Sequence, residues 1–334
     1  MKNILFVSLT IFTLVAKAQL HKKVSFTPTN YYSYFAASTK PVLTIKAGDT
    51  IVTSSVDCEG FDKKGIKCTI GAAVNPLTGP FFIEGAEEGD VLKVTLTDIK
   101  FTRNTAMCLP YFHPRSMHDS STKLAQNDSI SLIWDLNFKK NTASLHKKTA
   151  HLKNFEVALN PFLGCVGVAA PKEQTLPTSD AGPNGGNMDF NRIKKNATVY
   201  LPVYNKGALL YLGDGHAAQG DGEINLSALE TSLAYSFVVE IVKSPKKQIA
   251  YPRVEDAEYM MTVGIDATLD NSLKIATKGM LDWLQEDYHL TIEEATQFMG
   301  ASIEYKIAEI VDPKVEMVAM IKKKTLQMLQ KNNN

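Results

Sequence analysis

The chain has 334 residues, 44% of them hydrophobic and 21% charged, and its 36 basic residues balance 35 acidic ones to a net charge of +1. This length suffices for one large folded domain. Because the charges nearly cancel, no strong field favours a nucleic acid or an anionic membrane surface as partner. We therefore expect a small neutral or weakly charged molecule as the partner.

Residues 1–18 have the pattern of a secretory signal peptide. Lys2 supplies a positive charge, the apolar stretch at 4–15 is short for a bilayer span, and Ala16-Lys17-Ala18 resembles a cleavage site. A buried first strand or helix is the alternative. The pattern predicts an exported protein, periplasmic or secreted, in which residues 19–334 form one domain. No later apolar run is long enough to span, so we expect no membrane association after cleavage.

The four cysteines do not form a zinc or redox motif. An oxidising compartment would permit disulfides, and Cys58 and Cys68 are the closest pair in sequence. A chain of this size does not need such a link, so Cys58, Cys68, Cys108 and Cys165 are equally well explained as unpaired thiols.

Strand patterns dominate the first three quarters of the chain. The turn at 47–49 separates the apolar segments 42–45 and 51–53, which predicts a hairpin. The turn at 204–207 separates the segments 197–203 and 208–212, which predicts a second hairpin. Residues 91–99 alternate as a half-buried strand does. Residues 235–242 are nearly all apolar, which is typical of a strand buried on both faces. The polar stretch 170–187 is predicted to be a loop.

The period changes near the C-terminus. Apolar residues between Leu273 and Leu284 recur at three- and four-residue spacing, which predicts a helix. Thr291 and Glu294 form a capping-box pattern that opens a second helix, and 315–321 favours a last strand. The fold class we expect is mainly β, a jelly-roll-like β-sandwich with a C-terminal helical segment.

The segment at 212–223, LGDGHAAQGDGE, has the densest set of reactive side chains. It holds four glycines, three carboxylates, a histidine and a glutamine. On a strand, Asp214 and His216 face the same side, and Asp221 and Glu223 have the same relation. Imidazole with carboxylate suits zinc or a similar divalent cation; calcium is an alternative, although histidine is a poor calcium ligand. An ordinary polar turn is the structural alternative.

Two further positions are candidates. Gly185 and Gly186 precede Asn187 and Asp189, and a sharp turn there would present an amide that both donates and accepts hydrogen bonds. Asp57 follows the predicted strand at 51–53, and a strand end is a common place for a site. Each position is also explained by an ordinary turn or a satisfied acid.

Several of these motifs, taken together, resemble the acetamidase/formamidase family. They are NPLTGP at 75–80, IEGAE at 83–87 with GD at 89–90, GCVGVA at 164–169, GGNMD at 185–189 and, most specifically, GDGHAAQGDGE at 213–223. The likeness extends over roughly residues 25–325. It implies a mainly β, jelly-roll-like fold, a homo-oligomer, and hydrolysis of a short-chain amide to a carboxylate and ammonia.

The candidate acids and His216 match acids and the histidine of the family motifs, and the chemistry of their side chains suggests a role for each. Asp57, Asp214 and His216 would hold a divalent metal, zinc first and calcium second, and a metal-activated water would attack the amide. Glu223, or Asp221 after it, would transfer the proton. The set expected to contact the substrate is Asn187, Asp189 and Glu84.

Two departures from the family pattern bear on the substrate. Asp57 is followed here by Cys58-Glu59-Gly60-Phe61 rather than a short polar stretch, and the chain carries an export signal. A larger or unusual amide is therefore an alternative substrate, and so is a cyclic or nitrogen-rich one. A secreted jelly-roll module that binds a sugar or a divalent cation without turnover is the alternative from another class.

Overall fold

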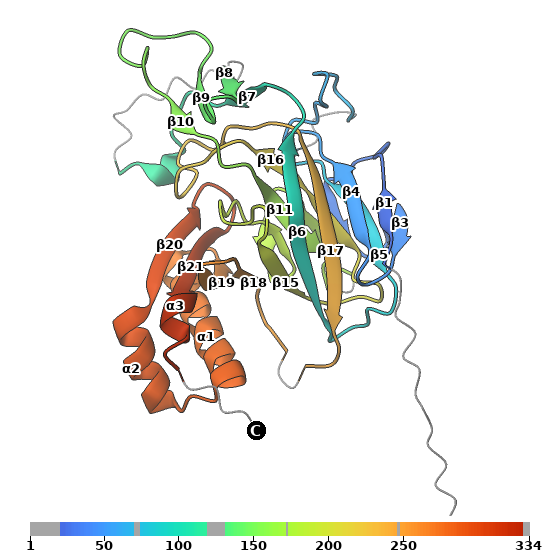
Figure 1. The fold of residues 1–334 in the computed structure, drawn as a ribbon, viewed down its shortest axis with the longest axis vertical. Helices are drawn as coiled ribbons and strands as arrows, with labels where there is room; N and C mark the ends of the chain where they lie inside the picture. The colour runs from blue at the N-terminus through green and yellow to red at the C-terminus, as the bar shows by residue number, and fades with distance from the viewer. Residues whose placement is uncertain (1–20, 70–73, 119–130, 172, 246–247, 330–334) are drawn as a thin grey trace, which may run out of the picture.

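The computed structural model describes residues 21–69, 74–118, 131–171, 173–245 and 248–329. The predicted signal peptide lies outside these residues. Within them the chain is mainly β, with helices near the C-terminus (Figure 1). None of the helices in the described ranges combines the length and apolar character that crossing a bilayer requires.

The largest sheet has nine strands. Its order is β1 (Lys23–Ser25), β4 (Thr50–Ser54), β17 (Leu233–Val242), β6 (Val91–Phe101), β15 (Thr198–Pro202), β18 (Arg253–Glu255), β19 (Tyr259–Asp266), β21 (Val315–Lys322) and β20 (Glu304–Glu309). The predicted strands at 91–99, 235–242 and 315–321 are confirmed as β6, β17 and β21.

A six-stranded sheet packs against it. The order is β13 (Ala181–Gly182), β14 (Gly185–Asn187), β11 (Phe162–Val168), β16 (Leu210–His216), β5 (Thr78–Ile83) and β3 (Leu43–Ile45). Phe81 on β5 meets Phe237 on β17 edge to face at 5.4 Å between ring centroids, inside one apolar cluster that both sheets share. Burial of this cluster is the main force that holds the two sheets together.

Two smaller sheets complete the β structure of the described residues. One has the order β10 (Val157–Ala158), β9 (Thr142–Leu145), β8 (Leu132–Asn137) and β7 (Thr105–Cys108), and the other pairs β12 (Thr175–Pro177) with β2 (Tyr34–Ala36). The predicted loop at 170–187 therefore contains three short strands, β12, β13 and β14. A short 3₁₀ turn covers Pro114–Ser116.

Both predicted hairpins are wrong. β3 pairs in parallel with β5, whereas β4 pairs with β1 and β17; likewise β15 belongs to the nine-stranded sheet and β16 to the six-stranded one. Each turn carries the chain from one sheet to the other. At the first turn, Ile45 before it and Ile51 after it are both buried in the apolar cluster that the two sheets share. The mainly β class is confirmed, as several mixed sheets; this strand order does not establish a jelly roll.

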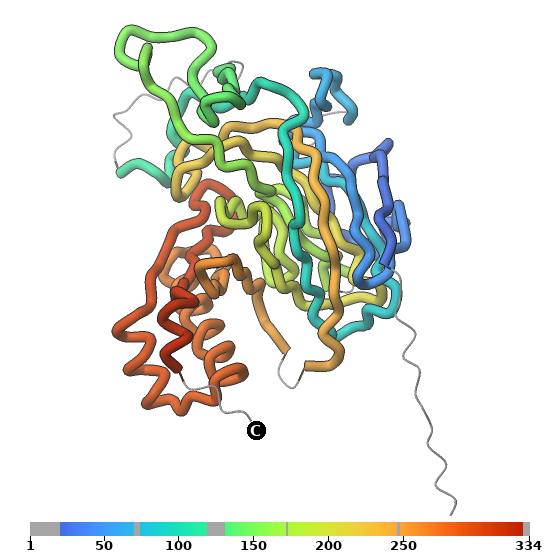
Figure 2. Tube along the Cα trace, viewed as in Figure 1, coloured from blue at the N-terminus to red at the C-terminus, as the bar shows by residue number. Residues whose placement is uncertain are grey.

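The C-terminal helical segment is confirmed. Helix α1 (Leu269–Tyr288) packs on β19 and β21, with Met280 and Leu284 in the shared cluster. Helix α2 (Ile292–Ser302) begins with the predicted capping box, in which Thr291 and Glu294 bond reciprocally. A short α3 (Lys323–Leu326) follows β21. In Figure 2 this segment forms one side of the molecule, and the turn between β20 and β21 reaches back towards the strands.

All four cysteines are unpaired, Cys58 half-buried, Cys68 exposed, and Cys108 and Cys165 buried.

Candidate functional site

A cavity of about 490 Å³ lies where the ends of β14 and β16 meet the loop at 217–232 and the turn between β20 and β21. Its lining contains six carboxylic acids, Glu59, Asp189, Asp214, Glu223, Glu230 and Asp312, against Lys67 and His216. Such an excess of acid in one hollow is a strong signal of a bound cation or of a proton-transfer centre.

His216 is the centre of the acid group. Its Nε2 lies 3.4 Å from Asp214 Oδ1 and 3.2 Å from Glu230 Oε2, while Nδ1 lies 3.7 Å from Asp189 Oδ1. The ring packs edge to face on Phe162, with ring centroids 4.7 Å apart, which fixes its orientation. Acids therefore lie against both nitrogens of one imidazole.

Four buried atoms of this group have no hydrogen-bond partner. They are Asp189 Oδ1, Asp214 Oδ1, His216 Nδ1 and Glu230 Oε2. Buried polar atoms are almost always satisfied in folded proteins, so this concentration indicates a group of side chains arranged to bind a ligand. Two sets of three could hold a metal ion, Asp189–His216–Glu223 and Asp214–His216–Glu230, each with its ligand atoms within 4.8 Å of one another. The donors fit a divalent cation.

Burial and mutual repulsion disturb the pKa of each member. Burial alone would lower the pKa of His216, but Glu230 and Asp214 outweigh it and raise that pKa well above the ordinary value. Burial, followed by the neighbouring charges of Glu223 and Asp214, raises the pKa of Asp189 well above its usual range. Positive charge at this point would therefore be strongly favoured, since it would let the acids ionise.

The backbone is arranged around these side chains. Asp189, Asp214 and Glu223 have φ values of 39°, 57° and 49°, in the left-handed region that non-glycine residues seldom occupy. Gly164 on β11 lies beneath them: a Cβ there would stand 2.2 Å from Asp189 Oδ1 and 2.6 Å from Asp214 Oδ2. Only glycine leaves room for the acids to converge above the strand.

The structure brings together five of the eight residues predicted for the site. Asp214, His216, Asp189, Asn187 and Glu223 all line the cavity. Asn187 is fully engaged: its Nδ2 donates to Asp189 at 2.6 Å and to Asp312 at 2.9 Å, and its Oδ1 accepts from Asn75 at 2.8 Å. Asn187 therefore orients two acids and has no donor hydrogen left for a substrate.

The other three predicted residues lie outside the cavity. Asp57 is bound to Arg103, with Asp57 Oδ2 2.6 Å from Arg103 Nη2, and its Oδ1 accepts from two backbone amides. Asp221 is exposed and paired with Lys306 at 2.9 Å. Glu84 is exposed, 3.8 Å from Lys46. Each acid already has a partner, and none of the three lines the cavity at His216.

Residues that sequence reasoning missed include Glu230 and Asp312. Glu230 is held opposite His216 by an isolated antiparallel bridge, and Asp312 is carried by the turn that follows β20. Neither belongs to a glycine-rich motif, and nothing local in the sequence marks them. Asn75 also lines the cavity, and its only signal in the sequence is its place in the NPLTGP motif of the family resemblance.

Further acids lie behind the cavity. Glu309 and Glu316 are directly across from one another on β20 and β21, both fully buried. Burial, followed by the charge of Asp312, raises the pKa of Glu309 to about 10. Burial likewise raises the pKa of Glu316 well above its usual range, with Asp312 adding to the effect. Glu309 therefore carries its proton at neutral pH.

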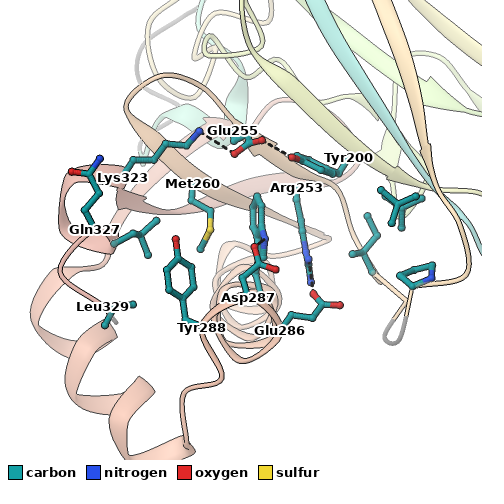
Figure 3. Close-up of a pocket in the computed structure, with 16 residues that line it drawn as sticks. Tyr200, Arg253, Glu255, Met260, Glu286, Asp287, Tyr288, Lys323, Gln327 and Leu329 are labelled. Atoms are coloured by element: carbon teal, nitrogen blue, oxygen red, sulfur yellow. Dashed lines mark hydrogen bonds and ion pairs between the residues drawn. The ribbon is translucent and has the colours of Figure 1, made fainter. Parts of the chain in front are cut away.

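A larger hollow of about 710 Å³ lies between α1, α3 and strands β18 and β19 (Figure 3). Its charges are matched: Glu286 pairs with Arg253 at 2.7 Å, and Glu255 binds Lys323 at 3.0 Å and accepts from Tyr200. None of the unpartnered buried atoms of the described residues lines it. Size alone does not make this hollow the reactive centre.

Comparison with known proteins shows which family this chain resembles. Residues 25–180 and 172–324 match the model of the acetamidase/formamidase family. A formamidase of Methylophilus methylotrophus is 27% identical over 72% of this chain and 74% of its own. A protein of Schizosaccharomyces pombe, provisionally assigned as a formamidase, is 26% identical over 62% of this chain and 62% of its own length, so the match spans less than two thirds of that relative.

Solved structures agree as well. A predicted acetamidase/formamidase of the thermophile Thermoanaerobacter tengcongensis superposes with a TM-score of 0.77 at 28% identity, covering 92% of this chain and 98% of that one. An acetamidase of Bacillus halodurans gives 0.76 at 27% identity, covering 92% and 99%. Because the family model matches most of the chain and the fold agrees over nearly its whole length, this protein belongs to the acetamidase/formamidase family.

Proposed function

We propose that the chain hydrolyses a linear short-chain amide, of the formamide or acetamide type, to a carboxylate and ammonia in the cavity around His216. Family membership supplies the reaction class, amide hydrolysis. The observation that supports this cavity as the place of the reaction is the set of four buried, unpartnered atoms on His216 and its neighbouring acids.

We further propose that a divalent cation, zinc first, is held by His216 Nε2 with Asp214 and Glu230. A neutral imidazole has one lone pair, so one nitrogen ligates and the other donates. Nε2 is the nearer to its acids, and Nδ1 then carries the proton and faces Asp189. One nitrogen with two carboxylates suits zinc better than calcium, which prefers oxygen ligands alone. Asp57 has no part in this set.

A divalent cation held by these residues would supply a water whose pKa is lowered towards about 7 and a positive charge to polarise the carbonyl group of the amide. Glu223 is buried, lines the cavity and remains outside the proposed ligand set, so it is placed to take a proton and return it to the departing nitrogen. General acid–base catalysis of this kind contributes about 10² to 10⁴ in rate. Asn187 holds Asp189 in position for the imidazole.

The test combines metal analysis with ammonia release from formamide and acetamide, with and without a chelator. His216→Ala should lose both bound metal and activity. Asp221→Asn is the matched control, because it removes an acid of the same loop that lies outside the cavity, and it should keep both. A metal-free wild type with full activity, or a metallated and active His216→Ala, would refute the mechanism.

The same experiment separates the rival function. A protein that binds the cation tightly but releases no ammonia from any amide is better described as a binding module for a sugar or a divalent cation.

We also propose export and self-association. Export is supported by residues 1–18 alone, and a mature protein that does not begin at Gln19 when isolated from the periplasm or medium would count against it. A homo-oligomer is suggested by the family resemblance, and light scattering of the purified protein measures it directly.

A further inference from the structure

Apolar side chains form part of the wall of the cavity at His216. Met107, Leu109, Leu226 and Val311 all line it, and none of the four belongs to a hydrophobic cluster of the described structure. Met107 and Val311 are only 9% and 6% exposed. A buried apolar side chain that packs into no core has its contact surface directed elsewhere, here into the cavity.

The position of Met107 follows from the strand that carries it. On β7, Ala106 and Cys108 pack into the core of the small sheet, so Met107 between them faces the opposite side. Met107 and Glu230 exchange both backbone hydrogen bonds, at 3.0 and 2.8 Å, and Glu230 in turn bridges to His216. Directly opposite residues present their side chains on one face, which places the thioether next to the acid–imidazole centre.

Leu226 enters the cavity from a strained loop. Its φ is 62°, a left-handed conformation that leucine rarely adopts, and its side chain is 37% exposed. The loop is fastened to Leu109, whose amide donates to Ser227 Oγ at 2.8 Å and whose carbonyl accepts from Asn225 at 3.2 Å. Strain of this kind persists where surrounding contacts impose it and is concentrated at functional sites.

The size and charge of the cavity limit the occupant further. A volume of about 490 Å³ is in the range that holds drug-sized ligands, whereas formamide and acetamide are far smaller. The six lining acids exclude an anionic group, since Lys67 is the one lysine among the lining residues of the described structure.

We propose that the cavity accepts an amide with a longer, uncharged apolar acyl chain, and that Met107, Leu109 and Leu226 hold that chain. This inference rests on the proposed amide hydrolysis and specifies its substrate class. Each methylene buried against the apolar wall should raise kcat/KM about fourfold.

The experiment compares kcat/KM for formamide, acetamide and hexanamide, together with two charged analogues of hexanamide, adipamate and 6-aminohexanamide. Hexanamide should be the best of the five, and adipamate should be at least about tenfold poorer than hexanamide. The ratio of kcat/KM for hexanamide to that for formamide should fall roughly tenfold in Leu226→Ala and in Met107→Ala.

Phe155→Ala is the control. Phe155 lines a separate, adjacent hollow, so the ratio should not change. A wild-type ratio at or below one overturns the inference, as does a loss in Phe155→Ala that equals the loss in Leu226→Ala. A preference for 6-aminohexanamide overturns it too, because the acids would then select a cation.

Calorimetric binding of hexanamide and formamide to the zinc-loaded protein is measured alongside. If no amide is hydrolysed, the proposed function fails. The binding data still test the apolar wall, because tighter binding of hexanamide than of formamide supports it and the reverse order contradicts it.

Discussion

Replacing Gly164 with alanine should disable the site through a single methyl group. The added Cβ would stand 2.2 Å from Asp189 Oδ1, 2.6 Å from Asp214 Oδ2 and 2.8 Å from His216 Cε1. Non-bonded carbon contacts are comfortable at about 3.5 to 4.0 Å. All three side chains must therefore withdraw, by roughly an ångström where the overlap is worst.

The magnitudes follow from that displacement. Overpacking of a filled interior costs about 1 to 3 kcal/mol of stability. A misplacement of about 1 Å at a reacting centre costs about 10²-fold in rate. We therefore expect Gly164→Ala to remain folded, with kcat/KM for acetamide reduced about a hundredfold and with weaker metal binding.

The assay measures urea unfolding, bound metal and ammonia release for Gly164→Ala and for Gly213→Ala. In the second variant the new methyl meets the Leu77 side chain at 2.8 Å, an apolar contact outside the acid group. Gly213→Ala should therefore lose stability while retaining metal. If Gly164→Ala keeps wild-type metal affinity and activity, the acids do not converge above this glycine, and the proposed arrangement of the site is refuted.

Three further predictions concern the surroundings of the site. Arg103→Met should cost about 3 to 5 kcal/mol in urea unfolding, because it leaves the buried Asp57 carboxylate without its partner; a cost below about 1 kcal/mol would mean that the pair is as weak as a surface one. Asn187→Ala should weaken metal binding about 10- to 100-fold by releasing Asp189, and unchanged binding in a metal titration would count against its positioning role. Glu309 keeps its proton up to about pH 10 in the folded chain and loses it near pH 4.5 in the unfolded chain. Between those pH values the folded state binds more protons than the unfolded state, so the free energy of unfolding falls as the pH rises, by up to about 1.4 kcal/mol per pH unit. Glu309→Gln should flatten that slope in chelator-treated protein, and an identical slope in the two proteins would remove Glu309 as its cause.

The sequence indicated the centre of the site because that centre is local. Asp214 and His216 are two residues apart on one strand, so their convergence is a consequence of strand geometry. Asn187 and Asp189 are similarly close in sequence. Their approach to His216 comes from β14 pairing with β11, and β11 with β16, which no local pattern specifies.

Contacts between segments that are distant in the sequence could not be predicted from the sequence. Asp57 had the appearance of a ligand at a strand end, yet Arg103, 46 positions away, binds it. Glu230 and Asp312 are isolated acids whose neighbours reveal nothing. The predicted hairpins were wrong for the same reason, since a turn signal does not tell whether the chain stays in its sheet or crosses to the other one.

The hydrogen bonds that join Asn75 to Asn187 and Asn187 to Asp312 link three segments that are more than a hundred positions apart in the sequence. The last wall of the cavity is supplied by a turn only a few residues before the final strand, β21. A nascent or C-terminally truncated chain that stops short of this turn thus lacks an enclosed site, however well its earlier strands have folded. The cavity is therefore enclosed only once the hairpin of β20 and β21 has formed.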